Sequence, residues 1–258
     1  MSPRLRLGLA AGGLAVAFGV ASIPVIQGTD PTLVSTAPAV GWDIASRMWP
    51  PDVPYLLELL GPLWDTFAMA TLGTLLAIGL ALPVAVLSAR NVTPSRVLAR
   101  PAATLTIVGS RSVNSLVWAL LVVAIVGPGT LAGVLAIALR SVGFVAKLTA
   151  EAIEEIDERP VEALTATGSA APVVWRWAIG PQVLPSLIAT TLFRWEINIR
   201  ESTVLGFVGA GGIGLQLNAA MQALQWERVS LVLLVILVTV LGSEALASGL
   251  RARIIGDR

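Results

Sequence analysis

The chain has 258 residues, of which 55% are hydrophobic and 13% are charged, and its formal net charge is +1. A soluble domain usually carries about 25% charged residues, so this composition indicates an integral membrane protein. Cysteine and histidine are both absent. Their absence excludes disulfides, thiolate or imidazole metal sites and a histidine general base, and the small net charge gives no sign of a nucleic-acid partner.

Six apolar segments are long enough to cross a bilayer as helices, since a hydrocarbon core of about 30 Å requires roughly 20 mostly apolar residues. The first segment follows Arg4 and Arg6, as the apolar part of a signal peptide would. Its apolar run is longer than such a region and no clear cleavage site follows, so we expect it to be retained. The six predicted spans are 7–26, 64–88, 103–126, 130–149, 183–205 and 229–250.

The distribution of arginine predicts the orientation of these spans, because cytoplasmic loops carry an excess of Lys and Arg. If the N-terminus is cytoplasmic, the outer segments 27–63, 127–129 and 206–228 contain only Arg47 and Arg228. Both termini are therefore expected in the cytoplasm. The inner segments 89–102, 150–182 and 251–258 contain Arg90, Arg96, Arg100, Arg159, Arg176, Arg251, Arg253 and Arg258.

Aromatic residues mark the outer interface. Trp42, Trp49 and Trp64 cluster there, as amphipathic rings tend to do. The stretch PDVPYLLELLGPLW, at 51–64, is compatible with a short helix lying on that surface.

The long inner segment contains EALTATGSAAPVVWRWAIGP at 162–181. This stretch resembles the cytoplasmic signature of the permeases of binding-protein-dependent ABC importers, and Glu162, Ala163, Gly168 and Pro181 match in register. Leu164, Ala178 and Gly180 depart from it, so the end of the signature is degraded. The resemblance implies that 150–182 forms short coupling helices that dock on a separate ATPase subunit.

The residue chemistry suits such a contact. Small side chains let another backbone approach closely, and Glu162 can pair with a base across the contact. The alternative is an ordinary amphipathic loop helix that ends at a glycine. The candidate ATPase-coupling residues are Glu162, Ala163, Leu164, Ala166, Gly168 and Pro181.

Four further stretches, at 111–123, 141–157, 181–187 and 194–214, are similar to the phosphonate/phosphite branch of these permeases. The resemblance covers about residues 60–250. It implies an all-α integral membrane protein with six transmembrane helices and the methionine-permease-like fold of type I ABC importers. Residues 1–60 would form the first span and an external segment, and 61–258 the permease domain.

The same resemblance implies the function and the partners. The chain would be a multi-pass subunit in the bacterial inner (plasma) membrane that imports phosphonates by alternating access. Its partners would be a second copy of itself, two ABC ATPase subunits, an external phosphonate-binding protein and lipid. ATP and magnesium would be bound by the ATPase, and this subunit would hold no cofactor and no metal.

Four charged residues lie at the end of the fifth predicted span. On a helix, Glu196 and Arg200 are neighbours, as are Arg194 and Asn198, and Arg194 and Glu201 are two turns apart on one face. Charges within a membrane segment are costly and point to a function. Two bases and two acids also cancel, so these residues either brace the helix or contact a passing anion.

Arg111 and Arg140 have no acid nearby in the sequence. Facing a cavity, they would attract an anion into a low-dielectric path and bind its oxygens bidentately. The alternative is that Arg111 extends to the inner surface or pairs with a remote acid. The candidate pathway residues are Arg111, Asn114, Arg140, Arg194, Glu196, Asn198, Arg200 and Glu201.

Gly209, Gly211 and Gly214 formally satisfy the dinucleotide-binding pattern G-x-G-x-x-G. That pattern requires a strand before it, a helix after it and an acid about 20 residues further on, and we expect none of these here. A close-packed turn on the outer side is the better interpretation. The resemblance places this turn, with Gly209, Gly211, Gly212 and Gly214, near an external gate.

Nothing in the sequence indicates an enzyme. The P-loop pattern is absent, so ATP hydrolysis would belong to a separate subunit. Alternatives within transport are permeases for phosphate, phosphite or methionine. An ATP-independent secondary transporter or channel is a further alternative, although no internal repeat is evident, and an intramembrane enzyme is disfavoured without His and Cys.

Overall fold

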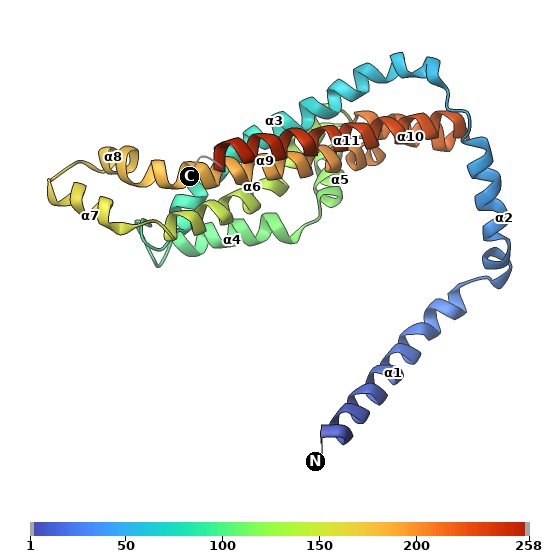
Figure 1. The fold of residues 1–258 in the computed structure, drawn as a ribbon, viewed down its shortest axis with the longest axis horizontal. Helices are drawn as coiled ribbons and strands as arrows, with labels where there is room; N and C mark the ends of the chain where they lie inside the picture. The colour runs from blue at the N-terminus through green and yellow to red at the C-terminus, as the bar shows by residue number, and fades with distance from the viewer. Residues whose placement is uncertain (1–2, 256–258) are drawn as a thin grey trace. The chain divides into compact units, whose positions relative to one another are not determined.

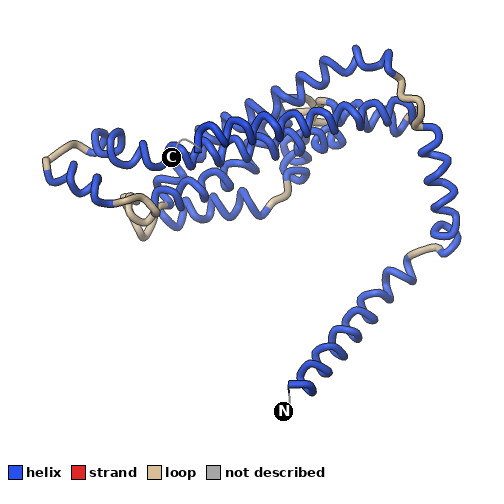
Figure 2. The backbone as a smooth tube through the Cα atoms, viewed as in Figure 1, coloured by secondary structure: helices blue, strands red, loops and turns tan. Residues whose placement is uncertain are grey.

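A computed structural model describes residues 3–255, and all their regular elements are helical (Figure 1, Figure 2). Arg258, one of the predicted inner arginines, lies outside these residues. The chain divides into two units, one ending at Pro50 and one beginning at Pro51. The first contains α1 (Pro3–Gly28) and α2 (Pro31–Arg47). Asp30 caps α2, because its side chain accepts a hydrogen bond from the backbone N–H of Thr32 at 2.9 Å.

The second unit is built around the packing of α3 (Leu56–Ser88), which follows the short helix η1 (Val53–Tyr55), against α6 (Thr130–Glu154). Small residues recur on the buried face of α3 every three or four positions: Ala70, Gly73, Ala77, Ala81 and Ala85. Small side chains let two helix backbones approach closely in a membrane. α9 (Gly180–Leu205) packs against both helices, and α11 (Trp226–Ile255) packs against α9.

The predicted span 103–126 is not one straight helix. α4 (Ala99–Ser112) and α5 (Ser115–Val126) meet at an angle of 95°. Val113 is extended, and the Asn114 side chain accepts a hydrogen bond from the backbone N–H of Leu116 at 2.9 Å, so that it begins a new helix. An asparagine cap satisfies the first free amides of α5 and thereby favours the break.

The glycine-rich stretch is a break between two helices. After α9 come η3 (Gly206–Val208) and α10 (Ile213–Gln222), and the two arms of this pair are bent by 42°. Gly209, Gly211 and Gly212 have φ values of 85°, 86° and 71°, which favour glycine. The expectation that no helix follows the glycines is therefore wrong. Helices and not a strand precede them among the described residues, so the dinucleotide interpretation still fails.

The expected close packing at these glycines is confirmed. A Cβ atom on Gly212 would lie 2.6 Å from Cε of Met69, and one on Gly214 would collide with the carbonyl oxygen of Thr203. The predicted outer segment 206–228 contains the helix α10, which packs against α11. The turn itself is the break of a bent helix pair and not an extended loop.

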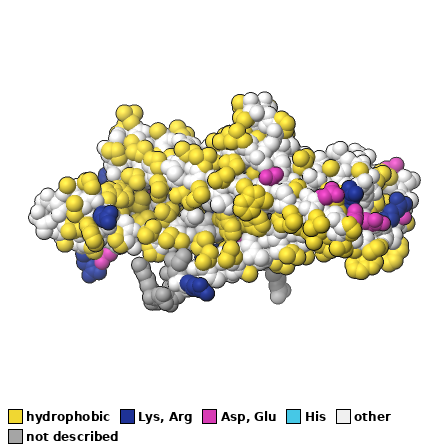
Figure 3. Space-filling model, turned by 90° about the horizontal axis from the view of Figure 1, so that it is seen from above, with side chains coloured by type: hydrophobic (Ala, Val, Ile, Leu, Met, Phe, Trp, Pro, Cys, Tyr) yellow, Lys and Arg dark blue, Asp and Glu magenta, His cyan; other side chains and the backbone are white. Residues whose placement is uncertain are grey.

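By length and composition, the described residues contain four helices able to cross a membrane, and six spans if each bent pair counts as one. This agrees with the prediction of six. The suggestion of a separate surface helix at 51–64 is wrong, because Leu56 begins the helix that continues to Ser88. Hydrophobic side chains cover much of the face in Figure 3, as lipid contact requires.

The long inner segment forms three short helical pieces before α9. They are α7 (Glu158–Ala166), α8 (Ala171–Val174) and the wide turn η2 (Trp175–Ile179). Asp157 caps α7 by accepting a hydrogen bond from the backbone N–H of Arg159 at 3.0 Å. None of the residues of α7 is buried.

We predict that Gly73→Ala destabilises the protein by about 1–3 kcal/mol, because overpacked cores carry a cost of that size. A Cβ on Gly73 would lie 2.6 Å from Cγ2 of Ile137 on α6. The matched control on the same helix is Gly79→Ala, where no atom lies within 4 Å of the new Cβ. The measurement is the thermal unfolding midpoint in detergent. Equal midpoints for the two variants would contradict the tight α3–α6 contact.

Candidate functional site

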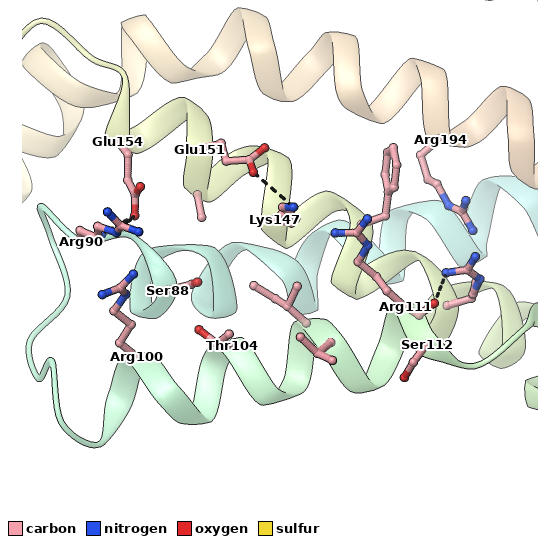
Figure 4. Close-up of a pocket in the computed structure, with 15 residues that line it drawn as sticks. Ser88, Arg90, Arg100, Thr104, Arg111, Ser112, Lys147, Glu151, Glu154 and Arg194 are labelled. Atoms are coloured by element: carbon pink, nitrogen blue, oxygen red, sulfur yellow. Dashed lines mark hydrogen bonds and ion pairs between the residues drawn. The ribbon is translucent and has the colours of Figure 1, made fainter. Parts of the chain in front are cut away.

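A basic cavity of about 720 Å³ lies between α4, α6, the end of α3 and α9 (Figure 4). Among its lining residues, only Glu151 and Glu154 are acidic. Ser88, Thr104 and Ser112 add hydroxyl groups. A negatively charged molecule would be favoured in such a cavity over a cation. The basic residues of the lining are Arg90, Arg100, Arg111, Arg140, Lys147 and Arg194.

The cavity is elongated, with charged groups at both ends. Arg90, Arg100 and Glu154 lie together at one end, and Arg111, Ser112 and Arg194 lie at the other (Figure 4). The wall formed by α6 is a single helix face, since its lining residues recur every three or four positions. These residues are Arg140, Phe144, Lys147, Ala150, Glu151 and Glu154.

The basic residues of the lining differ in whether an acidic side chain pairs with them. Nζ of Lys147 lies 3.5 Å from a carboxylate oxygen of Glu151, and Nε of Arg90 lies 3.9 Å from Glu154. Arg100, Arg111 and Arg140 form no ion pair with any acid in the described part of the chain. Arg140 donates instead to the backbone carbonyl of Arg111 at 3.1 Å. An incoming anion thus meets guanidinium groups that no carboxylate occupies.

Arg194 is the most enclosed of the basic residues, with a side chain that is 4% exposed. Its guanidinium lies 3.3 Å from Glu201, donates to Oγ of Ser141 at 2.9 Å and stands 5.5 Å from the ring centre of Phe144. The predicted pairing with Glu201 is confirmed. A buried charge needs such partners, because unpaired burial is costly.

Asn198 joins the network of Arg194 through Ser141. Its side chain accepts from Ser141 at 3.2 Å and donates to Oγ1 of Thr74 at 2.8 Å. These hydrogen bonds connect α9 with α6 and α3 in a region where water is scarce. The network therefore fixes the wall of the cavity that carries Arg194.

Glu196 faces away from the cavity lining and joins two helices. It pairs with Arg200 on the next turn of α9 at 2.7 Å, as predicted, and with Arg251 of α11 at 3.2 Å. The side chain of Glu196 is only 6% exposed. This geometry matches the bracing role considered from the sequence, since two bases hold one buried carboxylate between α9 and α11.

The structure brings Arg111, Arg140 and Arg194 together in one cavity. Asn114 marks the α4–α5 break, and Glu196, Asn198, Arg200 and Glu201 are not part of the lining. Sequence reasoning missed Lys147, Glu151 and Glu154 as lining residues and treated Arg90 and Arg100 only as markers of orientation. The spacing of seven, four and three residues between Arg140, Lys147, Glu151 and Glu154, which places them on one helix face, was the available signal.

The candidate coupling residues occupy an exposed loop. Glu162, Ala163, Leu164 and Ala166 lie on α7, and Gly168 follows with a φ of 76° that favours glycine. Pro181 lies in the first turn of α9 and lines a cavity of about 400 Å³. The pKa of Asp157, which caps α7, is lowered because its carboxylate accepts hydrogen bonds from Arg159. The side chain of Arg159 has the larger effect and its backbone N–H the smaller one.

Gln182 holds the base of this loop. It accepts from the backbone N–H of Asp157 at 2.9 Å and donates to the carbonyl of the same residue at 3.2 Å. The start of α7 is thereby tied to the first turn of α9.

The glycine turn also has a fixed partner. The backbone N–H of Gly129, in the hairpin between α5 and α6, donates to the carbonyl of Gly209 at 2.9 Å. A Cβ on Gly211 would lie 3.3 Å from Thr130. Of the four predicted gate residues, Gly209 and Gly211 thus face the hairpin, and Gly212 faces Met69 of α3.

The family and the relatives that this chain matches are all components of transport systems. The family described as binding-protein-dependent transport system inner membrane component matches residues 81–255. The phosphite transport system permease protein PtxC of Stutzerimonas stutzeri is 40% identical over 245 residues, which cover 93% of this chain and 88% of that protein. The phosphate-import permease protein PhnE of Mycolicibacterium smegmatis is 37% identical over 219 residues, or 84% of this chain and 41% of that protein.

A solved structure shares the fold. An inward-facing form of the MetNI methionine ABC transporter aligns with a TM-score of 0.67 at 22% sequence identity. The alignment covers 79% of this chain and 99% of that chain. The expected all-helical, methionine-permease-like fold is confirmed.

We predict that Asp157→Ala speeds amide hydrogen exchange across 158–166 by about fivefold, because loss of a helix cap costs about 1 kcal/mol. Asp157→Asn keeps an oxygen that can cap α7 and serves as the matched control. Hydrogen-exchange mass spectrometry of the purified protein provides the measurement. Wild-type exchange in the alanine variant would show that the cap does not hold α7.

Proposed function

The chain belongs to the family of binding-protein-dependent transport system inner membrane components, and from this premise we propose that it imports a phosphorus oxyanion. It is a multi-pass permease subunit of an ABC importer in the inner membrane and is not itself an enzyme. The basic cavity is the observation that carries the choice of substrate class. Phosphonate is our first candidate, with phosphite and phosphate as close alternatives.

The chemistry of the cavity favours this class. Phosphonate, phosphite and phosphate all present tetrahedral phosphorus with several charged oxygens, and arginine binds such oxygens bidentately. Arg100, Arg111 and Arg140 form no ion pair with a described acid, so they are available to an anion without loss of an existing pair. Between apolar helices this attraction is stronger than in bulk water, because the surroundings are less polar.

Two observations on relatives support the assignment. The relative from Stutzerimonas is named for phosphite and the one from Mycolicibacterium for phosphate. Methionine, which the name of the solved transporter mentions, is a zwitterion without net charge. A lining of six basic and two acidic residues favours a net anion over such a zwitterion.

The proposed assembly contains two copies of this chain, two ATPase subunits and an external binding protein. The exposed helix α7, followed by Gly168, is suited to dock in a groove of the ATPase. ATP and magnesium would bind to that partner. ATPase closure would move α7 and, through Gln182, the start of α9, so that the cavity alternates between the two sides of the membrane.

The glycine turn is proposed to act in the external gate. Gly209, Gly211 and Gly212 adopt backbone conformations that other residues rarely adopt, and Gly214 sits against the backbone of α9. Together they join α9 to α10 at a bend with almost no side-chain volume. The glycines let the bend pack closely against α3, α6 and α9, so that a movement of α9 would be felt at the turn.

We predict ATP-dependent uptake of labelled phosphonate by liposomes that contain this subunit with its ATPase and binding protein. Phosphite and phosphate serve as competitors within the substrate class, and methionine is the matched competitor outside it. The measurement is the initial uptake rate with and without ATP. Uptake that does not require ATP, or competition by methionine alone, would contradict the proposed function.

We further predict that Arg111→Gln and Arg140→Gln each reduce the uptake rate at low substrate by about tenfold or more, because a hydrogen bond to a charged group contributes roughly 1.5–3 kcal/mol. Glutamine keeps a donor but removes the charge. Arg96→Gln, an exposed arginine outside the cavity lining, is the control. Wild-type uptake by both cavity variants would remove these arginines from the pathway.

A further inference from the structure

The two acids of the basic cavity require an explanation. Glu151 and Glu154 line the same space as six basic side chains, on the same face of α6 as Arg140 and Lys147. If the cavity existed only to attract an anion, these two carboxylates would oppose its function. Neither carboxylate takes part in the ion pairs that hold α9 in place.

Their position along the cavity is distinctive. Arg140 and Glu154 are separated along α6 by roughly 21 Å, at 1.5 Å per residue. Arg111 and Arg194 lie at the end of the cavity away from Glu154, and the Lys147–Glu151 pair lies between the two ends (Figure 4). An anion that travels from Arg111 toward Glu154 therefore meets Arg111 and Arg140 before it reaches either carboxylate, and Arg100 lies beside Glu154 at the far end.

The ion pairs that the two carboxylates form are long and partly exposed. Lys147 and Glu151 are 47% and 48% exposed, and their closest charged atoms are 3.5 Å apart. Arg90 is 71% exposed, and its Nε lies 3.9 Å from Glu154. Exposed pairs of this kind contribute little stability and are easily exchanged for another partner. By contrast, the pair of Arg194 with Glu201 is enclosed.

A permeation path must bind its substrate well enough to admit it and weakly enough to let it leave. Six basic side chains around a doubly charged anion help to admit it but oppose its release. A carboxylate beside each of two bases would favour release. It competes with the anion for the base and repels the anion at the same time.

We propose that Glu151 and Glu154 are the release residues of the cavity, which expel a tetrahedral phosphorus oxyanion toward the cytoplasm by competing with it for Lys147 and Arg90. This proposal rests on the proposed function. The anion first exchanges solvent for Arg111 and Arg140. It next displaces Glu151 from Lys147 and then Glu154 from Arg90, and each freed carboxylate recovers its base as the anion departs.

Glutamine at these positions tests the charge without removing the hydrogen-bonding atoms. Glu154 accepts a hydrogen bond from the backbone N–H of Arg90 at 2.8 Å, which the amide oxygen of glutamine can also accept. Glu155→Gln is the matched control, since Glu155 is the adjacent residue and lines a different cavity. Glu151→Asp keeps the charge and is expected to behave as wild type.

The first experiment measures equilibrium binding of inorganic phosphate, phosphite and a simple alkyl phosphonate to the assembled complex in nanodiscs without nucleotide. The expected result is binding about three- to tenfold tighter in Glu151→Gln and Glu154→Gln, because one repulsive charge is removed at partly screened distance. Binding that is equal in these variants, in Glu155→Gln and in wild type would overturn the proposal.

The second experiment separates KM from the maximal rate of ATP-driven uptake in liposomes. Slower release predicts a lower maximal rate together with a lower KM for the two glutamine variants, whereas a merely structural defect lowers the rate without lowering KM. If wild type takes up none of the three anions, the proposed function itself fails. If wild type transports and the variants match Glu155→Gln, only the release role fails.

Anionic lipid provides a further arm, because its headgroup phosphate shares the chemistry of the substrate. The binding measurement is repeated in phosphatidylcholine nanodiscs with and without phosphatidylglycerol. Release residues for a free anion predict the same effect of glutamine in both lipids. An effect that appears only with phosphatidylglycerol would assign the carboxylates to excluding lipid and overturn the release role.

Discussion

Close contact between α3 and α6 is the constraint on which the second unit depends. It is made by the small residues Ala70, Gly73 and Ala77, and Gly73 lies so near Ile137 that a methyl group has no room. One face of α6 is thereby committed to α3. The charged residues from Arg140 to Glu154 lie on another face, where α4 and the end of α3 complete a cavity wall. Packing and charge are thus divided between two sides of one helix.

Several polar side chains inside the helix bundle are paired with one another, because an unpaired polar group is costly where water is scarce. Arg194 has Glu201 and Ser141, Asn198 has Ser141 and Thr74, and Glu196 has Arg200 and Arg251. These contacts hold α9 against three neighbouring helices. Arg100, Arg111 and Arg140, which form no ion pair with a described acid, stand apart from this scheme, and all three line the cavity. Paired charges thus hold the helices together, whereas the unpaired arginines are available to an anion.

Much of the fold was predictable because long apolar runs have few alternatives to a membrane helix. The pairs Glu196–Arg200 and Arg194–Glu201 were predictable for a similar reason, since helix geometry alone brings them together. The average hydropathy of the span 103–126 is high in spite of Asn114, so it gave no sign of the break between α4 and α5. Glycines 209–214 were expected to end a helix, and the helix α10 that follows them was missed. Arg251, Thr74 and Ser141 could not be assigned as partners without knowing which helices pack together.

The hydrogen bond from Gly129 to Gly209 links two places where helices stop. One is the hairpin that ends α5, and the other is the bend that begins α10. Both contributors are backbone groups, so the bond does not depend on any side chain, but it does depend on the length of each loop. Insertion or deletion of one residue in either loop would move its partner out of register. The two loops are therefore expected to keep their lengths, and a change of length in one would require a matching change in the other.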